Sequence, residues 1–169
     1  MKKNIIAFIL IAVIAVLIIK GVKIESVDDY YLSHIDDITS ESETVFLTIR
    51  CDEILSNWDD LKTQLQSGGY VPEDGIILKK TEYVLRSGDT VYDIFDRAVR
   101  YNKIQTDVKK SVTGGIYVLS INNIYEYDCG ALSGWMYSVN GVAADASSDS
   151  YALKDGDEIM WMYTVDMKI

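Results

Sequence analysis

The residues with the clearest potential for binding chemistry lie close together in the last third of the sequence. Strict alternation places Trp135, Tyr137 and Val139 on one face of an expected strand. A flat aromatic edge of this kind suits a flat, largely apolar ligand with peripheral amides. The predicted ligand-binding residues are Ser133, Gly134, Trp135, Tyr137 and Asn140. The alternative is that the two aromatic residues belong to the core and that Asn140 serves only a turn.

A second group of side chains that could do chemistry is the oxygen-rich run 145–150. Its carboxylates and hydroxyls stand at alternate positions, as in a calcium-binding loop. The glycine at the sixth position of such a loop is missing, and Gly156 stands where the final glutamate belongs. We therefore interpret this run as a polar loop and predict no metal site.

Enzymatic chemistry has little support in the residue types. His34 is the only histidine, which excludes most histidine-based triads and histidine-rich metal sites. Burial of Asp89, Asp155 and Asp157 as a close carboxylate group would reopen the question, but each stands in an expected turn where water solvates it. No nucleophile paired with a base is visible in the sequence. We predict a non-enzymatic protein without catalytic residues.

The first half of the expected folded region contains two strands and two helices. Alternation predicts strands over 44–50 and 80–86. Apolar residues at helical spacing predict a helix over 54–65 that stops at Ser67-Gly68-Gly69. The second helix is the clearest element of the chain, with Thr90 as its N-cap and Asp93 three residues later. Its apolar stripe runs over residues 91–99, and Asn102 is a reasonable end.

From residue 103 onward the pattern is that of β structure. Strands are expected at 116–121, 135–139, 151–153 and 158–165. The dipeptide Asn140-Gly141 is a strong signal for a hairpin turn. The last strand is apolar on both faces, with Trp161 and Tyr163 on one of them, so we expect it at the centre of a sheet beside strand 44–50. The order of elements predicts an α+β domain with a mixed sheet and one or two packed helices.

Length and composition limit the classes of protein to consider. The chain has 169 residues, of which 49% are hydrophobic and 25% charged, as in a foldable globular domain. The formal net charge is −10; residues 1–23 contribute +4 through four lysines, which leaves −14 for the rest. Nucleic-acid binding needs clustered Lys and Arg, so we predict no nucleic-acid partner.

The N-terminal segment has the form of an export signal. Basic residues at positions 2 and 3 precede an unbroken apolar run from Ile5 to Ile19. No pair of small residues marks a cleavage site after it, so an uncleaved single-pass membrane anchor is favoured over a cleaved signal. We predict a signal or anchor over 1–23, an acidic, serine-rich stalk over 24–43 and a folded domain over 44–169, exposed outside the cell or secreted if cleavage occurs.

The sequence then resembles a known family. The run YEYDCGALSGWMYSVNG at 125–141 is similar to the signature of the bacterial transcobalamin-like C-terminal domain. Four further pieces match in order: LTIRC (47–51), VPEDGIIL (71–78), GDTV (88–91) and YALKDGDEI (151–159). The resemblance covers about residues 44–165.

This resemblance implies a β-grasp domain that binds a soluble ligand and is exported by Gram-positive bacteria. In the transcobalamins and intrinsic factor, the related domain forms one side of a corrinoid-binding cleft, and an α-helical barrel forms the other. No such barrel fits in this chain. Cobalamin or another corrinoid is therefore the possible ligand that the resemblance implies, and no cofactor is certain.

Cys51 and Cys129 are the only cysteines, and both fall in the matched motifs. Outside the cell a disulfide between them is chemically permitted, and two free buried thiols are the alternative. A rival motif begins at Tyr83 and ends at Ile94, where the sequence also looks like the opening of a peptidoglycan-binding LysM module. That match fails after the first helix.

Two functions from different classes follow from these observations. The first is a membrane-anchored extracellular domain that binds a small ligand, such as the corrinoid that the resemblance implies, for an uptake partner. The second is a non-enzymatic surface module for adhesion or protein interaction. A pocket beside the Trp135 hairpin favours the first function, and a flat apolar patch without a cavity favours the second.

Overall fold

The computed structural model describes residues 38–111 and 114–168. The predicted signal or anchor segment lies outside these residues, as do most of the predicted stalk and His34. None of the helices in the described ranges combines the length and the apolar character needed to cross a membrane.

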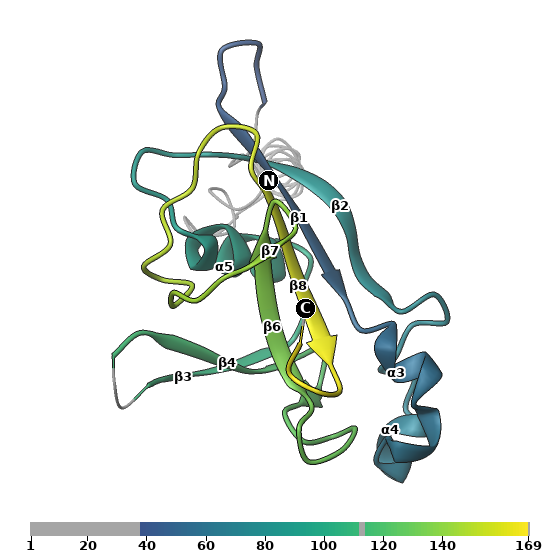
Figure 1. Ribbon diagram of the computed structural model, residues 1–169. Coiled ribbons are helices and arrows are strands. Elements are labelled where there is room, and N and C mark those ends of the chain that lie inside the picture. The colour runs from purple at the N-terminus through teal and green to yellow at the C-terminus, as the bar shows by residue number, and fades with distance from the viewer. Residues whose placement is uncertain (1–37, 112–113, 169) are drawn as a thin grey trace, which may run out of the picture. The chain divides into compact units, whose positions relative to one another are not determined.

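A five-stranded mixed sheet forms the centre of the described domain (Figure 1). In spatial order its strands are β2 (Ile76–Val84), β1 (Thr44–Arg50), β8 (Glu158–Thr164), β6 (Gly134–Val139) and β7 (Val142–Ala143). The central pair, β1 and β8, is parallel, and the other neighbours are antiparallel. The predictions of strand β1, of a central last strand and of its position beside β1 are confirmed.

A separate three-stranded sheet consists of β3 (Thr106–Lys110), β4 (Ile116–Ile121) and β5 (Ile124–Tyr125). Strand β4 was predicted, whereas β3 was missed. Because β3 is an edge strand whose side chains are mostly exposed, its sequence lacks the apolar alternation that marks a half-buried strand. In Figure 1 this small sheet crosses near one end of β6.

The core lies on one face of the five-stranded sheet. Register places Ile49 beside Trp161, and Trp161 beside Tyr137, so these buried side chains share that face. The principal helix, α5 (Val91–Tyr101), packs on it, with Phe95 and Trp161 ring centroids 4.8 Å apart. Val118 of the small sheet belongs to the same buried cluster. The result is an α+β domain that is mostly sheet, as predicted.

Helix α5 begins and ends as its sequence predicts. The side chain of Thr90 accepts a hydrogen bond from the backbone N–H of Asp93, and Asp93 accepts one from the backbone N–H of Thr90. This reciprocal arrangement satisfies two N–H groups that a helix start otherwise leaves unpaired. Asn102 is the C-cap, and its side chain donates to the carbonyl of Ala98.

The prediction of one helix over 54–65 is wrong. The chain instead forms three short pieces, α3 (Glu53–Ser56), the 3₁₀ turn η1 (Trp58–Asp60) and α4 (Thr63–Gln66). Asn57 leaves the helical conformation and donates its amide to the carbonyl of Glu53, and Leu61 is extended. An asparagine side chain that bonds to nearby backbone competes with the hydrogen bonds of a helix. Apolar spacing alone therefore gave a wrong prediction of one continuous helix.

Three smaller differences concern strands. The predicted strand 80–86 is β2, which starts earlier and ends at Val84. The predicted strand 151–153 is an isolated bridge between Ala152 and Thr90. The second face of β8 is only partly covered, because Met160 and Met162 are half-buried.

Candidate ligand-binding site

A pocket of about 310 Å³ lies between the small sheet and the core face of the large one. Strands β4 and β6, Trp161 of β8 and the segment 144–148 form most of its wall. The lining residues are Ser111, Gly114, Ile116, Tyr117, Val118, Trp135, Met136, Tyr137, Ala144, Asp145, Ala146, Ser147, Ser148 and Trp161. The volume falls at the lower end of the range typical of small-molecule sites.

Aromatic side chains form the rigid part of this pocket. Trp135, Tyr137 and Trp161 are 6%, 8% and 3% exposed. The centroids of the Tyr137 and Trp161 rings are 5.3 Å apart. The indole N–H of Trp135 donates to the Ile124 carbonyl at 2.8 Å, and the Tyr137 hydroxyl donates to the Ala146 carbonyl at 2.6 Å. Because packing and these hydrogen bonds fix the rings, the wall is formed before any ligand arrives.

Two buried polar groups of the pocket have no hydrogen-bond partner among the described residues. They are the indole nitrogen Nε1 of Trp161 and the hydroxyl Oγ of Ser148, and Ser148 is 2% exposed. A buried donor without a partner is costly, so nearly all such groups in folded proteins are satisfied. Both residues line the pocket, but these two atoms have almost no accessible surface, so neither is open to a molecule in it.

The charge of the pocket is negative. Asp145 is the one Asp, Glu, Lys, Arg or His among the lining residues, and it is exposed. The next carboxylate, Asp149, accepts a hydrogen bond from the backbone N–H of Ile116 at 3.1 Å. The pKa of Tyr137 is raised to about 12, first by burial, then by Tyr151 and by the charges of Asp145 and Asp149.

The predicted ligand residues do not all meet in this pocket. Trp135 and Tyr137 line it, whereas Ser133, Gly134 and Asn140 do not. Asn140 stands at the exposed tip of the β6–β7 hairpin, with a positive φ of 53°. Its amide donates to Asp157 at 2.8 Å, and its carbonyl oxygen accepts from the Glu158 N–H at 2.9 Å. The side chain therefore links the β6–β7 turn to the start of β8 by two hydrogen bonds.

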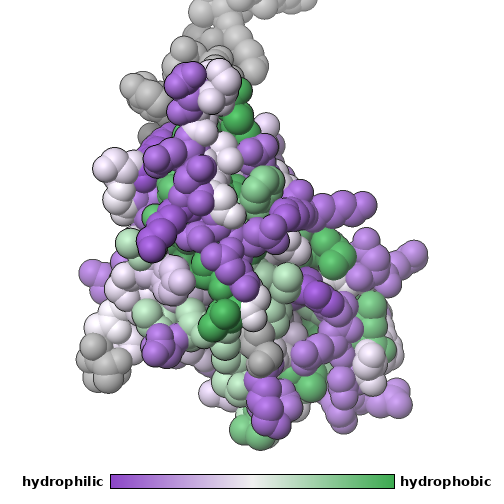
Figure 2. Space-filling model, turned by 45° about the horizontal axis from the view of Figure 1, so that its top comes forward, coloured by the Kyte–Doolittle hydropathy of each residue, from purple (hydrophilic) through white to green (hydrophobic). Residues whose placement is uncertain are grey.

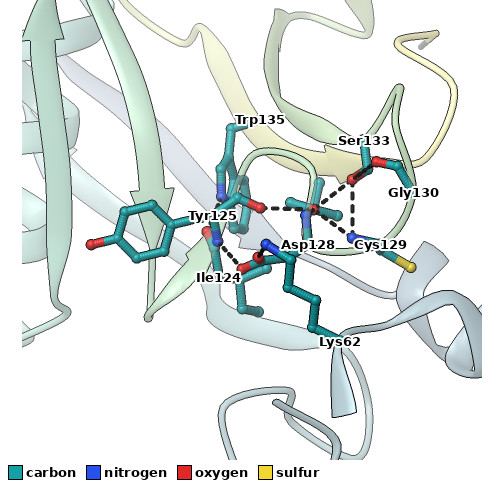
Figure 3. A network of polar contacts seen from close by, with 9 residues as sticks. Lys62, Ile124, Tyr125, Asp128, Cys129, Gly130, Ser133 and Trp135 are labelled. Carbon is teal, nitrogen blue, oxygen red and sulfur yellow. Dashed lines mark hydrogen bonds and ion pairs between the residues drawn. The ribbon is translucent and has the colours of Figure 1, made fainter. Parts of the chain in front are cut away.

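Ser133 belongs to a buried polar network on the other side of Trp135 (Figure 3). Its hydroxyl lies 2.8 Å from the Tyr163 hydroxyl and donates to the Gly130 carbonyl at 2.8 Å. Asp128 accepts from the Tyr125 N–H at 2.7 Å and pairs with Lys62 at 2.8 Å. These contacts occupy the polar groups of Ser133 and Asp128, so the network holds the 125–133 loop in place.

Sequence reasoning missed Ser148 and Asp145 as site residues. Both fall in the run interpreted as a polar loop, and neither has a spacing that distinguishes it from its neighbours. The alternation of the last strand placed Trp161 on the same face as Tyr163, but the strand is apolar on both faces, so its pattern did not decide which face points inward. Nothing in the sequence indicated that Trp161 lines a pocket.

Both cysteines are free thiols and both are buried. Burial, with added effects of Asp52 and Asp74, raises the pKa of Cys51 to about 12. The pKa of Cys129 is also raised, mainly by burial, and its thiol donates to the Asn57 carbonyl at 3.4 Å. The disulfide candidate is therefore not formed in this structure, and the alternative of two buried thiols describes it.

The three carboxylates considered for catalysis do not form one group. Asp89 is not solvated as expected, since it pairs with Arg97 at 2.7 Å and the two side chains are 12% and 10% exposed. Asp155 accepts from the Thr44 N–H at 2.8 Å at the exposed start of β1. Across 38–111 and 114–168, no set of three or more His, Cys, Asp or Glu side chains is placed to hold a metal ion.

The surface in Figure 2 is mainly hydrophilic, with apolar residues in smaller areas between charged ones. This face of the domain presents no single broad apolar patch. The pocket is therefore a more specific candidate for ligand binding than the surface shown in Figure 2.

Comparisons with known proteins agree with this fold. A domain of unknown function, DUF4430, matches residues 88–165. The match covers strands β4, β6 and β8 and the pocket residues on them. A search of curated proteins gave no match.

Among solved structures, the chain is similar to haptocorrin in complex with Cbi. The TM-score is 0.53 at 11% identity, over 78% of this chain and 27% of the haptocorrin chain. A proposed metal-binding protein from Ruminococcus gnavus ATCC 29149 gives a TM-score of 0.43 at 10% identity, over 73% of this chain and 97% of its own. At such identity the haptocorrin likeness shows the fold alone, and this chain spans about a quarter of that protein.

Proposed function

We propose that this domain binds a small molecule in the pocket between its two sheets. One observation carries the proposal: a pocket of about 310 Å³ between the two sheets has Trp135, Tyr137 and Trp161 in its wall. Contact with such side chains removes apolar surface from water and stabilises a bound molecule. The apolar part of a ligand would cover these aromatic residues, and its polar part would face the opening beside Asp145.

The finer proposal is a transcobalamin-like β-grasp domain whose ligand is cobalamin or another corrinoid. The fold shared with haptocorrin, which was solved with cobinamide, supports it. The pocket volume of about 310 Å³ suits one edge or one side chain of a corrinoid rather than the whole macrocycle. Most of such a ligand would therefore remain outside the pocket.

We further propose that the protein is not an enzyme and acts at the outside of a cell, held there by residues 1–23. The polar side chains in the pocket wall are two indoles, hydroxyls of serine and tyrosine, and one carboxylate, with no histidine, cysteine or lysine among them. The hydroxyl of Ser147 donates to the carboxylate of Asp149. An uptake protein at the membrane would be the natural recipient of the ligand. The alternative, a surface interaction module, is favoured by the half-buried Phe46 and Met160 on the sheet face away from the core.

The pocket proposal predicts changes at two of the three tryptophans. In ¹H–¹⁵N spectra of the full chain, the indole N–H signals of Trp135 and Trp161 should shift on ligand binding, because both residues line the pocket. Trp58, which is 37% exposed and lies outside the pocket, is an internal control.

Assignment of the three indole signals comes from the single variants W58F, W135F and W161F. Weaker ligand binding by Ser148→Ala, with an unchanged unfolding midpoint, would support contact of the ligand with the 144–148 wall of the pocket. A ligand that moves Trp58 alone, or that binds Ser148→Ala and W161F as tightly as the original chain, would place the site elsewhere and refute the pocket.

The corrinoid version has its own test. Titration of the full chain with cobalamin and with cobinamide should quench the fluorescence of Trp135 and Trp161 and release heat in a calorimeter. The variant W58F removes the background emission of the exposed tryptophan. Unchanged fluorescence and no heat at high micromolar corrinoid would exclude this ligand class but leave the pocket proposal standing.

A further inference from the structure

Exposed apolar side chains gather on three segments at one end of the large sheet. The segments are residues 50–62 around α3 and η1, the loop 126–133 and residues 165–168 after β8 (Figure 1). Half of the large apolar residues that are exposed in 38–111 and 114–168 lie on them. These residues, which we call the end patch, are Leu55, Trp58, Tyr127, Leu132 and Met167.

Hydrogen bonds join the first two segments. The backbone N–H of Lys62 donates to the Asp128 carbonyl at 2.9 Å, and the side chains of the same two residues pair at 2.8 Å. The Cys129 thiol donates to the carbonyl of Asn57, the residue before Trp58, at 3.4 Å. The α3–η1 region and the loop 126–133 therefore present their exposed side chains side by side.

The third segment adjoins both of the others. The backbone N–H of Val165 donates to the Glu53 carboxylate at 3.0 Å. The methyl carbon of Met167 lies 3.3 Å from the position that a Cβ atom would take at Gly134, directly after the loop 126–133. A groove of about 400 Å³ opens between α3 and this segment. The end patch is thus one surface with a recess beside it.

Two residues of the end patch have a backbone conformation that disfavours them. Tyr127 and Met167 have positive φ angles of 64° and 58°. Asn122, Asn123 and Asn140 occupy three other positions of this kind, and asparagine adopts this conformation more readily than a bulky residue does. The exposed side chains of Tyr127 and Met167 add nothing to the core. Strain of this kind persists at sites where function requires the residue.

The surroundings of the end patch are acidic. Its three segments contain seven acidic and three basic residues. Each base already pairs with an acid from the same segments, in the pairs Arg50–Asp52, Lys62–Asp128 and Lys168–Asp166. The carboxylates of Asp59 and Asp60 are exposed and form no ion pair within the described ranges. An excess of negative charge therefore surrounds the apolar side chains.

From the exposed apolar side chains, the strained backbone and the acidic surroundings we propose that the end patch docks a basic amphipathic segment of another protein. The apolar face of the partner would cover Trp58 and Leu132, and its lysines or arginines would face Asp59 and Asp60. A second copy of this chain would bring the same negative charge into the contact, which disfavours it. An anionic membrane or wall polymer would be repelled for the same reason.

This docking surface is separate from the proposed ligand pocket, because none of the five end-patch residues lines that pocket. The inference therefore goes beyond the proposed function and does not depend on it.

The probe is a helical peptide of about 14 residues with leucine on one face and lysine on the other. One control peptide has the same residues in scrambled order, and a second has glutamate in place of lysine. Binding to the full chain is measured by fluorescence anisotropy of the labelled peptides. The ordered lysine peptide should bind about tenfold more tightly than either control, and added salt should weaken its binding. In ¹H–¹⁵N spectra it should shift amide signals of the three segments.

Matched variants separate the end patch from other exposed residues. Leu132→Ser should weaken binding of the ordered peptide about fivefold, whereas Val142→Ser, at the tip of the β6–β7 hairpin, should not change it. Leu132 and Val142 are 63% and 69% exposed. Asp60→Asn should weaken binding about threefold, and Glu41→Gln, an equal change of charge at an exposed position before β1, should have no effect.

Tyr127→Asn distinguishes a residue that binds from one that only supports the fold. Because asparagine accepts a positive φ more readily, this variant should raise the midpoint of urea unfolding while it weakens peptide binding. A side chain needed only for the fold would lower the midpoint when it is replaced.

Equal affinity for the ordered and scrambled lysine peptides, or unchanged affinity in Leu132→Ser, would overturn this inference. Amide shifts confined to residues outside the three segments would do the same. Self-association of the chain that Leu132→Ser abolishes would show that a second copy covers the end patch, and would refute a basic partner. None of these outcomes touches ligand binding at the pocket, which the indole signals of Trp135 and Trp161 test separately.

Discussion

Gly75→Ala should lower the free energy of unfolding by about 3 kcal/mol. Gly75 has a φ of +68°, and a Cβ atom there would stand 2.8 Å from the backbone nitrogen of Asp52. Its carbonyl also accepts from the Cys51 N–H at 2.7 Å, which ties the start of β2 to the end of β1. A methyl group therefore meets backbone that cannot move without breaking this junction. Urea unfolding followed by far-UV circular dichroism measures the loss.

Gly69→Ala is the matched control for this prediction. Gly69 has nearly the same φ, +67°, but nothing lies within 4 Å of the added Cβ. Only the conformational cost of a left-handed residue remains, about 1 kcal/mol. The difference between the two variants isolates the close approach to Asp52. Equal losses of unfolding free energy in both variants would show that the backbone near Asp52 moves aside without cost, contrary to the prediction.

Tyr163→Phe should cost about 3 kcal/mol, because one hydroxyl serves several buried partners. The Tyr163 hydroxyl accepts from the N–H groups of Asp128 and Cys129 at 3.1 and 3.2 Å and donates to the Tyr125 carbonyl at 2.8 Å. It also lies 2.8 Å from the Ser133 hydroxyl. Phenylalanine keeps the ring packing but leaves these groups without their shared partner. Guanidinium unfolding of both proteins gives the difference.

Tyr137→Phe provides the comparison, since the Tyr137 hydroxyl forms one hydrogen bond within the described residues, to the Ala146 carbonyl. Its loss should cost about 1 kcal/mol. Hydrogen exchange adds a second readout, in which Tyr163→Phe should expose the amides of the 125–133 loop and Tyr137→Phe should not. A Tyr163→Phe protein as stable as Tyr137→Phe would mean that water replaces the lost hydroxyl.

The Tyr163 network also bears on the proposed site. Trp135 and Tyr163 rings meet edge to face with centroids 5.3 Å apart, and Trp135 donates to the carbonyl of Ile124, next to Tyr125. The loop held by Tyr163 therefore supports one wall of the pocket from behind. Ser133, expected to touch a ligand, instead helps to hold that wall.

The elements that sequence patterns predicted well are those whose signals are local. The capping residues of α5 and the Asn140-Gly141 turn depend on neighbours within a few positions. The failed helix over 54–65 shows the limit of such signals. Its apolar spacing was helical, yet the Asn57 side chain donates to the Glu53 carbonyl and Leu55 remains 38% exposed. Spacing reports which residues are apolar but not whether a core lies opposite them.

By itself the sequence determined the α+β class, the central position of the last strand and the shared face of Trp135 and Tyr137, because alternation fixes which residues of a strand occupy the same side. Only the tertiary structure decided that a pocket opens against that face. The reason is that β4, the 144–148 segment and Trp161 come together from distant parts of the chain. Whether an indole N–H finds a partner depends on that assembly and on no pattern in the chain.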